Sequence, residues 1–174
     1  MEGLPDVARE KLVEASRLSD DPIITFGLAE VDFELGHFTQ AIKEFASLDN
    51  RDIYEQTGIS TYQRIGVSYA SLGKFEAAIE FLQKAIELEY DESTVFELAV
   101  LLYDREEYQK ANIYFKQLDT LSPDYEGYEY IYAMSLHADH QVDVALLMAQ
   151  QGLAKNPFDS QLALLASQVS YELH

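Results

Sequence analysis

The chain has 174 residues and no cysteine, a length that allows one domain with a sizeable core and a composition that excludes disulfides and thiolate metal sites. Its 12 Lys and Arg residues against 31 Asp and Glu residues give a formal net charge of −19, which disfavours nucleic acid and anionic lipid and attracts basic peptides. There is no run of about 18 apolar residues to span a membrane and no signal-peptide pattern at the N-terminus, so we expect a cytoplasmic protein.

Apolar residues at helical spacing predict helices along the whole chain. Asp21 and Pro22 open one of them as an N-cap and a first-turn proline. The polar segment 49–58 is expected to be a longer loop. The pattern predicts about ten helices, arranged as half a unit at about 5–18, helix pairs at about 22–50, 57–89, 92–121 and 125–155, and half a unit at 159–174.

The segment Tyr62–Ile86 is the clearest of these units, with Gly73 separating two apolar helical stripes. Related segments recur at spacings of about 34 residues, from Ala78 to Ala111 and from Ala111 to Ala145. The order aromatic, Ile-Gly, Tyr and then Ala, Leu, Ala resembles the tetratricopeptide repeat, a helix–turn–helix of about 34 residues.

This resemblance covers nearly the whole chain and implies an all-α, right-handed superhelical solenoid of antiparallel helix pairs. It also implies that the first helix of each pair lines a concave face. We expect a single domain over 1–174 that is part of a longer repeat protein, because the pattern starts on a second helix and stops on a first helix. Two turns depart from the family, with Glu106 and His140 where it has glycine.

A second stripe remains on the first helices after the core stripe is removed, and it is mostly apolar or aromatic although an exposed helix face should be polar. It either grips a partner segment beside an acidic margin, or is half-buried between crowded helices. The small side chain of Val67 also predicts a depression there. The predicted partner-binding residues are Phe26, Glu30, Phe33, Gln63, Arg64, Val67, Phe96, Val100, Tyr103, Tyr130, Met134, His137, Leu164 and Tyr171.

No catalytic motif, metal-ligand set or cofactor loop is found, and we expect His137 and His140 to be solvated. We therefore predict a non-catalytic protein–protein interaction scaffold that binds a basic and apolar peptide or helix. One alternative is self-association, as a dimer or an array, through the terminal helices. The other is a peptide-sensing domain of a larger regulator.

Overall fold

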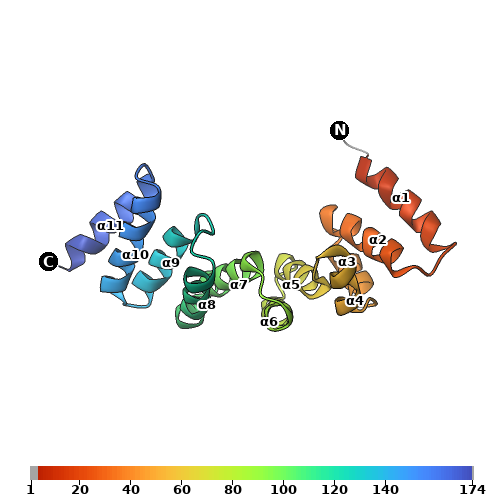
Figure 1. The fold of residues 1–174 in the computed structure, drawn as a ribbon, viewed down its shortest axis with the longest axis horizontal. Helices are drawn as coiled ribbons and strands as arrows, with labels where there is room; N and C mark the ends of the chain where they lie inside the picture. Colours follow the sequence, from red (N-terminus) through yellow and green to blue (C-terminus); the bar gives the residue numbers. More distant parts are fainter. Residues whose placement is uncertain (1–3, 174) are drawn as a thin grey trace. The chain divides into compact units, whose positions relative to one another are not determined.

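The computed structural model describes residues 4–173 (Figure 1), which contain eleven α-helices and no strand. This confirms the all-α fold expected from the sequence. The chain divides into two compact units, unit 1 up to Tyr90 and unit 2 from Asp91. In each unit, most successive helices pack on one another as antiparallel pairs.

Unit 1 contains one helix more than the sequence predicts. Its helices are α1 (Leu4–Ser16), α2 (Pro22–Glu34), α3 (Phe38–Phe45), α4 (Asn50–Thr57), α5 (Thr61–Ser71) and α6 (Phe75–Leu88). The expectation of a loop at 49–58 was wrong, because this segment forms α4. The second helix of the pair expected at about 22–50 ends at Phe45 instead.

Local capping explains why α4 forms. The Asp49 side chain accepts hydrogen bonds from the backbone N–H groups of Arg51 and Asp52, which lack partners at a helix start. Gly58 ends the helix with a positive φ of 72°. The segment is polar because most of α4 faces water, and Ile53 is the one apolar side chain that it buries fully.

The core of unit 1 joins α2, α3, α4 and α5. Phe26, Phe45, Ile53 and Ile65 form its buried centre. The α5–α6 pair approaches closely at Gly66, where a Cβ atom would lie 2.7 Å from Cγ of Leu82. The small residue in the repeat pattern therefore serves close helix packing.

Unit 2 consists of α7 (Glu92–Asp104), α8 (Tyr108–Leu121), α9 (Tyr128–Ala138), α10 (Val142–Lys155) and α11 (Ser160–Glu172). The helix α9 contacts both α7 and α11. Phe115 and Tyr132 stack in the core with ring centroids 5.3 Å apart. The first helices of neighbouring pairs are therefore held next to one another within this unit.

The two turns that lack glycine adopt the same geometry as the turns that have it. Glu106 and His140 have φ values of 60° and 61°, beside 69° for Gly73. The residue after each closes the same backbone hydrogen bond to the preceding helix, for example from Lys74 N to Tyr69 O at 2.9 Å. The missing glycines therefore change the strain of the turn and leave its shape intact.

We expect His140→Gly to raise the free energy of unfolding by about 0.5–1 kcal/mol, because a left-handed conformation strains a residue with a Cβ atom. The reverse change, Gly73→Ala, should lower it by about 1 kcal/mol. Nothing lies within 4 Å of a Cβ at Gly73, so backbone strain alone is tested there. Urea unfolding followed by circular dichroism measures both, and a less stable His140→Gly protein would contradict the expectation.

Candidate functional site

The predicted site residues of unit 1 come together around an ion pair between α2 and α5. Arg64 donates through Nε and Nη2 to the two carboxylate oxygens of Glu30, at 2.8 and 3.1 Å. Its guanidinium lies 5.0 Å from the centre of the Phe33 ring. The one basic residue in the predicted stripe is therefore neutralised within the protein.

Of the other three predicted residues of unit 1, one belongs to the core and two are half-buried. Phe26 is only 8% exposed and packs edge-on against Phe45, so it is a core residue. Gln63 and Val67 are half-buried, and the amide oxygen of Gln63 accepts from Arg64. Val67 lines neither of the two cavities described below.

In unit 2 two predicted aromatic residues, Phe96 and Tyr103, are half-buried and contact other rings. Phe96 lies 5.4 Å from Tyr125, and Tyr103 lies 5.7 Å from Tyr108, between ring centroids. Burial raises the pKa of the Tyr103 phenol, and the nearby Tyr108 and Tyr130 raise it further. The helices α7 and α9, which carry Tyr103 and Tyr130, contact each other.

The remaining predicted residues of unit 2 are exposed to different degrees. Nε2 of His137 lies 2.8 Å from a Glu172 carboxylate oxygen, a contact that lowers the pKa of Glu172 and links α9 to α11. Leu164 and Tyr171 on α11 are 71% and 86% exposed. Two residues of the stripe, Val100 and Met134, are half-buried.

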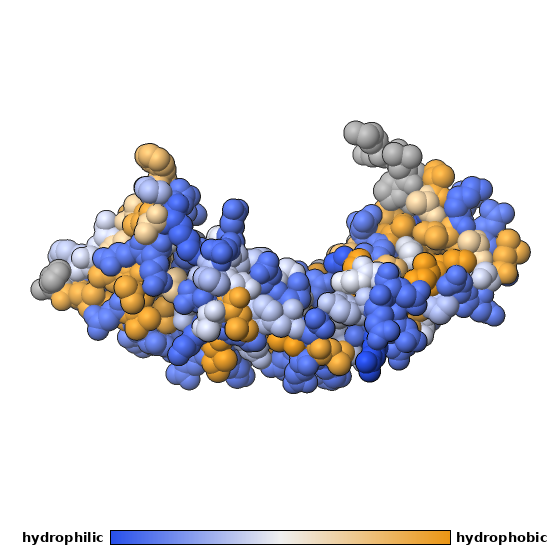
Figure 2. All heavy atoms as spheres, in the orientation of Figure 1, coloured by the Kyte–Doolittle hydropathy of each residue, from blue (hydrophilic) through white to orange (hydrophobic). Residues whose placement is uncertain are grey.

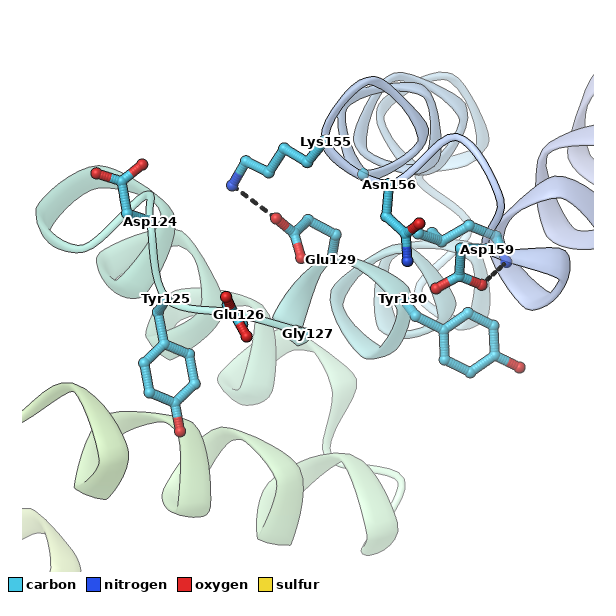
Figure 3. A pocket seen from close by; sticks show the side chains of 11 residues that line it. Asp124, Tyr125, Glu126, Gly127, Glu129, Tyr130, Lys155, Asn156 and Asp159 are labelled. Atoms are coloured by element: carbon cyan, nitrogen blue, oxygen red, sulfur yellow. Dashed lines mark hydrogen bonds and ion pairs between the residues drawn. The ribbon is translucent and has the colours of Figure 1, made fainter.

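One of the predicted residues, Tyr130, also lines a cavity of about 460 Å³ at the start of α9 (Figure 3). The loop before α9 supplies Asp124 and Tyr125, while the end of α10 and the loop after it supply Lys155 and Asn156 (Figure 3). We call this cavity the acidic recess. Its lining residues are Asp124, Tyr125, Glu126, Gly127, Glu129, Tyr130, Gly152, Lys155, Asn156, Asp159 and Leu162.

The recess carries an excess of negative charge. Lys155 Nζ lies 2.6 Å from a carboxylate oxygen of Glu129, which is 6% exposed, and it also donates to the backbone carbonyl of Pro123. The single cation of the lining is thus paired with the most buried of its four carboxylates. Asp124 and Glu126 face water from the loop with no cation against them in this lining.

Three of the four acidic residues of the recess were missed by reasoning on helix faces, because they come from the connections between helices. A signal was nevertheless present. Pro123 and Pro157 occupy equivalent places in two successive repeats, about 34 residues apart. Aligning the acidic residues that follow each proline would have brought Asp124 and Asp159 into view.

Comparisons with known proteins agree with the all-α repeat fold. A family model described as YpiA-like tetratricopeptide repeats matches residues 1–53, and a tetratricopeptide repeat model matches residues 59–89. Residues 1–89 thus carry matches to tetratricopeptide repeat models. Repeats of this family form protein–protein interaction modules and are generally non-catalytic. Within residues 4–173, no helix is both long and apolar enough to cross a bilayer.

One curated relative and two solved tetratricopeptide repeat structures illustrate the match. The chain is 27% identical to the TPR repeat-containing protein YpiA of Bacillus subtilis over 99% of its own length, and it spans 41% of that protein. YrrB, a TPR protein with an unusual peptide-binding site, has a TM-score of 0.74 at 20% identity, covering 94% of this chain and 84% of its own. MamA from Desulfovibrio magneticus RS-1 has a TM-score of 0.73 at 12% identity, covering 88% and 86%.

Proposed function

We propose that this tetratricopeptide repeat chain binds a basic segment of a partner protein, and that unit 2 receives it on α7, α9 and the acidic recess. The observation that carries the proposal is the meeting of Tyr130 with four carboxylates in one cavity whose single lysine is already paired. Lys or Arg side chains are attracted to such a site, and an aromatic ring beside it adds contact area. The peptide-binding site named for YrrB gives further support to a peptide ligand.

Two aromatic residues of α7, a helix that contacts α9, suit the same ligand. Tyr103 and Phe96 on α7 are half-buried and keep part of each ring at the surface. Aromatic side chains of this kind anchor partner segments because they bury a large area while losing few rotatable bonds. Basic residues of the partner would then enter the acidic recess while its apolar residues contact the rings.

Three finer points also stay proposals. A cytoplasmic location is supported by the absence of cysteine from the sequence. Self-association through the terminal helices has the exposed Leu164 and Tyr171 of α11 in its favour. A sensor role within a larger regulator is compatible with a relative that is more than twice as long.

The test uses a short fluorescent peptide that alternates Arg with apolar residues, and two matched peptides with Gln or Glu in place of Arg. We expect the Arg peptide to bind most tightly, and its binding to weaken as salt rises, because exposed charges are screened over about 8 Å at physiological ionic strength. We expect Glu126→Lys to weaken binding of the Arg peptide by about tenfold. Fluorescence anisotropy measures all three affinities.

A matched control separates the recess from the overall charge of the chain. Asp143 is an exposed acidic residue of α10 outside the recess, and Asp143→Lys changes the net charge by the same amount. This variant should keep most of the affinity for the Arg peptide. Equal loss in the two variants would mean that only the long-range field of the chain attracts the peptide.

A further inference from the structure

A second surface of unit 2 differs from the acidic recess in both place and chemistry. A cavity of about 510 Å³ lies between α8 and α10, and we call it the α8–α10 groove. Both helices pack on α9, which contributes Tyr132 and Leu136 to the lining. The groove is therefore a channel between two second helices, floored by the first helix between them.

Three apolar side chains on the walls of the groove are open to water. Ile113 of α8 is 65% exposed, and Val144 and Leu147 of α10 are 44% and 55% exposed. Figure 2 shows apolar surface over α8. Ile113 falls on the outer face of α8, away from the buried Ala111 and Phe115, so packing within unit 2 does not require an apolar side chain there.

The charged residues of the groove lining balance, whereas unit 2 as a whole is acidic. Unit 2 has four basic residues, and Arg105, Lys110 and Lys155 each pair with a carboxylate. The fourth, Lys116, lines the groove and has no ion pair among the described residues. Asp119 is the one carboxylate in the lining, and it accepts a hydrogen bond from the Tyr128 hydroxyl at 2.6 Å.

Besides Lys116, the groove contains a buried polar atom that lacks a hydrogen-bond partner. Asn112 lines the groove and is 8% exposed, and its Nδ2 donates to Asp139 at 3.1 Å. Its Oδ1 is buried and has no hydrogen-bond partner. A buried acceptor without a donor is costly, and a polar side chain of a ligand in the groove can supply that donor after a small movement of the wall.

We propose that the α8–α10 groove binds an amphipathic α-helix of a partner protein, with its apolar stripe against Ile113, Val144 and Leu147 and a carboxylate against Lys116. A helix fits because it satisfies its own backbone hydrogen bonds. The walls of the groove are themselves helices, so they offer side chains for contact and no backbone edge. Two helices resting on a third present the groove into which the apolar face of another helix packs. This proposal is independent of the basic segment proposed for the acidic recess.

The test uses the full chain, labelled with ¹⁵N, and three synthetic helical peptides of about 18 residues. All three carry the same leucine stripe, and the positions that flank it are Glu, Gln or Lys. We expect the Glu peptide to bind most tightly and to shift the amide signals of α8 and α10. We expect Lys116→Glu to reverse the order, so that the Lys peptide binds that variant best.

Substitutions on the walls test the apolar part of the contact. Leu147→Glu should weaken binding of the Glu peptide by about tenfold. Leu121→Glu is the matched control, since Leu121 is a 58% exposed leucine of α8 outside the groove lining, and it should leave the affinity within about twofold. Circular dichroism checks that both variants keep their helices.

Three outcomes overturn the proposal. The first is an unchanged order of peptides in Lys116→Glu, and the second is equal weakening by Leu121→Glu and Leu147→Glu. The third is a concentration-dependent dimer in sedimentation that Leu147→Glu abolishes, which would show that a second copy of this chain occupies the groove. Failure of the Arg peptide at the acidic recess leaves this proposal intact, because Glu126 lies outside the α8–α10 groove.

Discussion

Replacing Ile53 with alanine is expected to lower the free energy of unfolding by about 2–5 kcal/mol, although Ile53 belongs to a segment that is otherwise polar. Its side chain is fully buried among Phe26, Phe45 and Ile65. Truncation removes three carbon atoms from the centre of a core that α2, α3 and α5 share. The loss therefore includes both the transfer free energy of those atoms and the cavity that they leave.

The control for Ile53→Ala is Leu88→Ala in the same unit. Leu88 is 61% exposed on α6, and the substitution removes the same number of carbon atoms. It should change stability by no more than about 0.5 kcal/mol. Urea denaturation measures both, and comparable small effects in the two variants would mean that α4 is a surface loop with little role in the core.

The difference between α4, with one fully buried apolar residue, and helices with a broad apolar stripe explains why the sequence predicted most of unit 1 but not α4. Apolar periodicity identifies helices that bury a broad stripe, and α5 and α6 do so around Gly66 and Leu82. In α4 a single fully buried residue, Ile53, anchors a short helix whose other residues are mostly polar. A stripe of one residue has no period, so only the capping signals of Asp49 and Gly58 could have indicated the helix.

For the candidate site, the sequence predicted which helices carry the residues, but not how their side chains and the loops are arranged. The alignment of repeats correctly indicated which residues lie on the first helices, and Glu30, Phe33 and Arg64 do form one cluster. The ion pair itself depends on how α2 and α5 approach each other, which no sequence period encodes. The acidic recess depends on loop conformation, since Gly127 before α9 has a φ of 85° and turns the acidic loop toward the end of α10.

Replacing Asp32 with asparagine is expected to lower the free energy of unfolding by about 3 kcal/mol at neutral pH. The Asp32 side chain is fully buried and accepts from Arg9 Nε and Nη2, at 2.6 and 3.1 Å, while His37 Nδ1 lies 2.7 Å from its Oδ1. An amide cannot accept from Arg9 at both of its atoms. Breaking a buried ion pair costs about 3–5 kcal/mol of the free energy of unfolding. We expect a value at the lower end of this range, because Arg9 is 35% exposed and can still reach water.

The pH dependence of this difference follows from the direction of the Asp32 pKa. Burial alone would raise the pKa of the carboxyl, but the hydrogen bonds from Arg9 and His37 outweigh burial and lower it. The folded protein therefore binds this proton less tightly than the unfolded chain. The stabilisation is complete above the unfolded pKa of about 3.9 and is lost as pH falls through the lowered folded value. The gap between wild type and Asp32→Asn should narrow below about pH 4.

Glu44 on α3 provides a matched control with the opposite sign. Burial raises the pKa of its carboxyl, and the charge of Asp32 raises it further, while its Oε2 has no hydrogen-bond partner. The folded protein binds this proton more tightly than the unfolded chain, so ionised Glu44 lowers stability once pH rises above about 4.3. Glu44→Gln should therefore be at least as stable as wild type at neutral pH.

Thermal or urea unfolding from about pH 3 to pH 7 then tests whether the Arg9–Asp32 pair, or only the overall charge of the chain, stabilises the contact between α1 and α2. If Asp32 holds α1 to α2 through charge, its amide variant is destabilised at neutral pH and the Glu44 variant is not. Because the two substitutions replace a carboxylate by an amide on helices of the same unit, any general effect of losing a negative charge acts on both alike. Equal changes in both variants at pH 7 would show that the Arg9–Asp32 pair contributes no more than the overall charge of the chain.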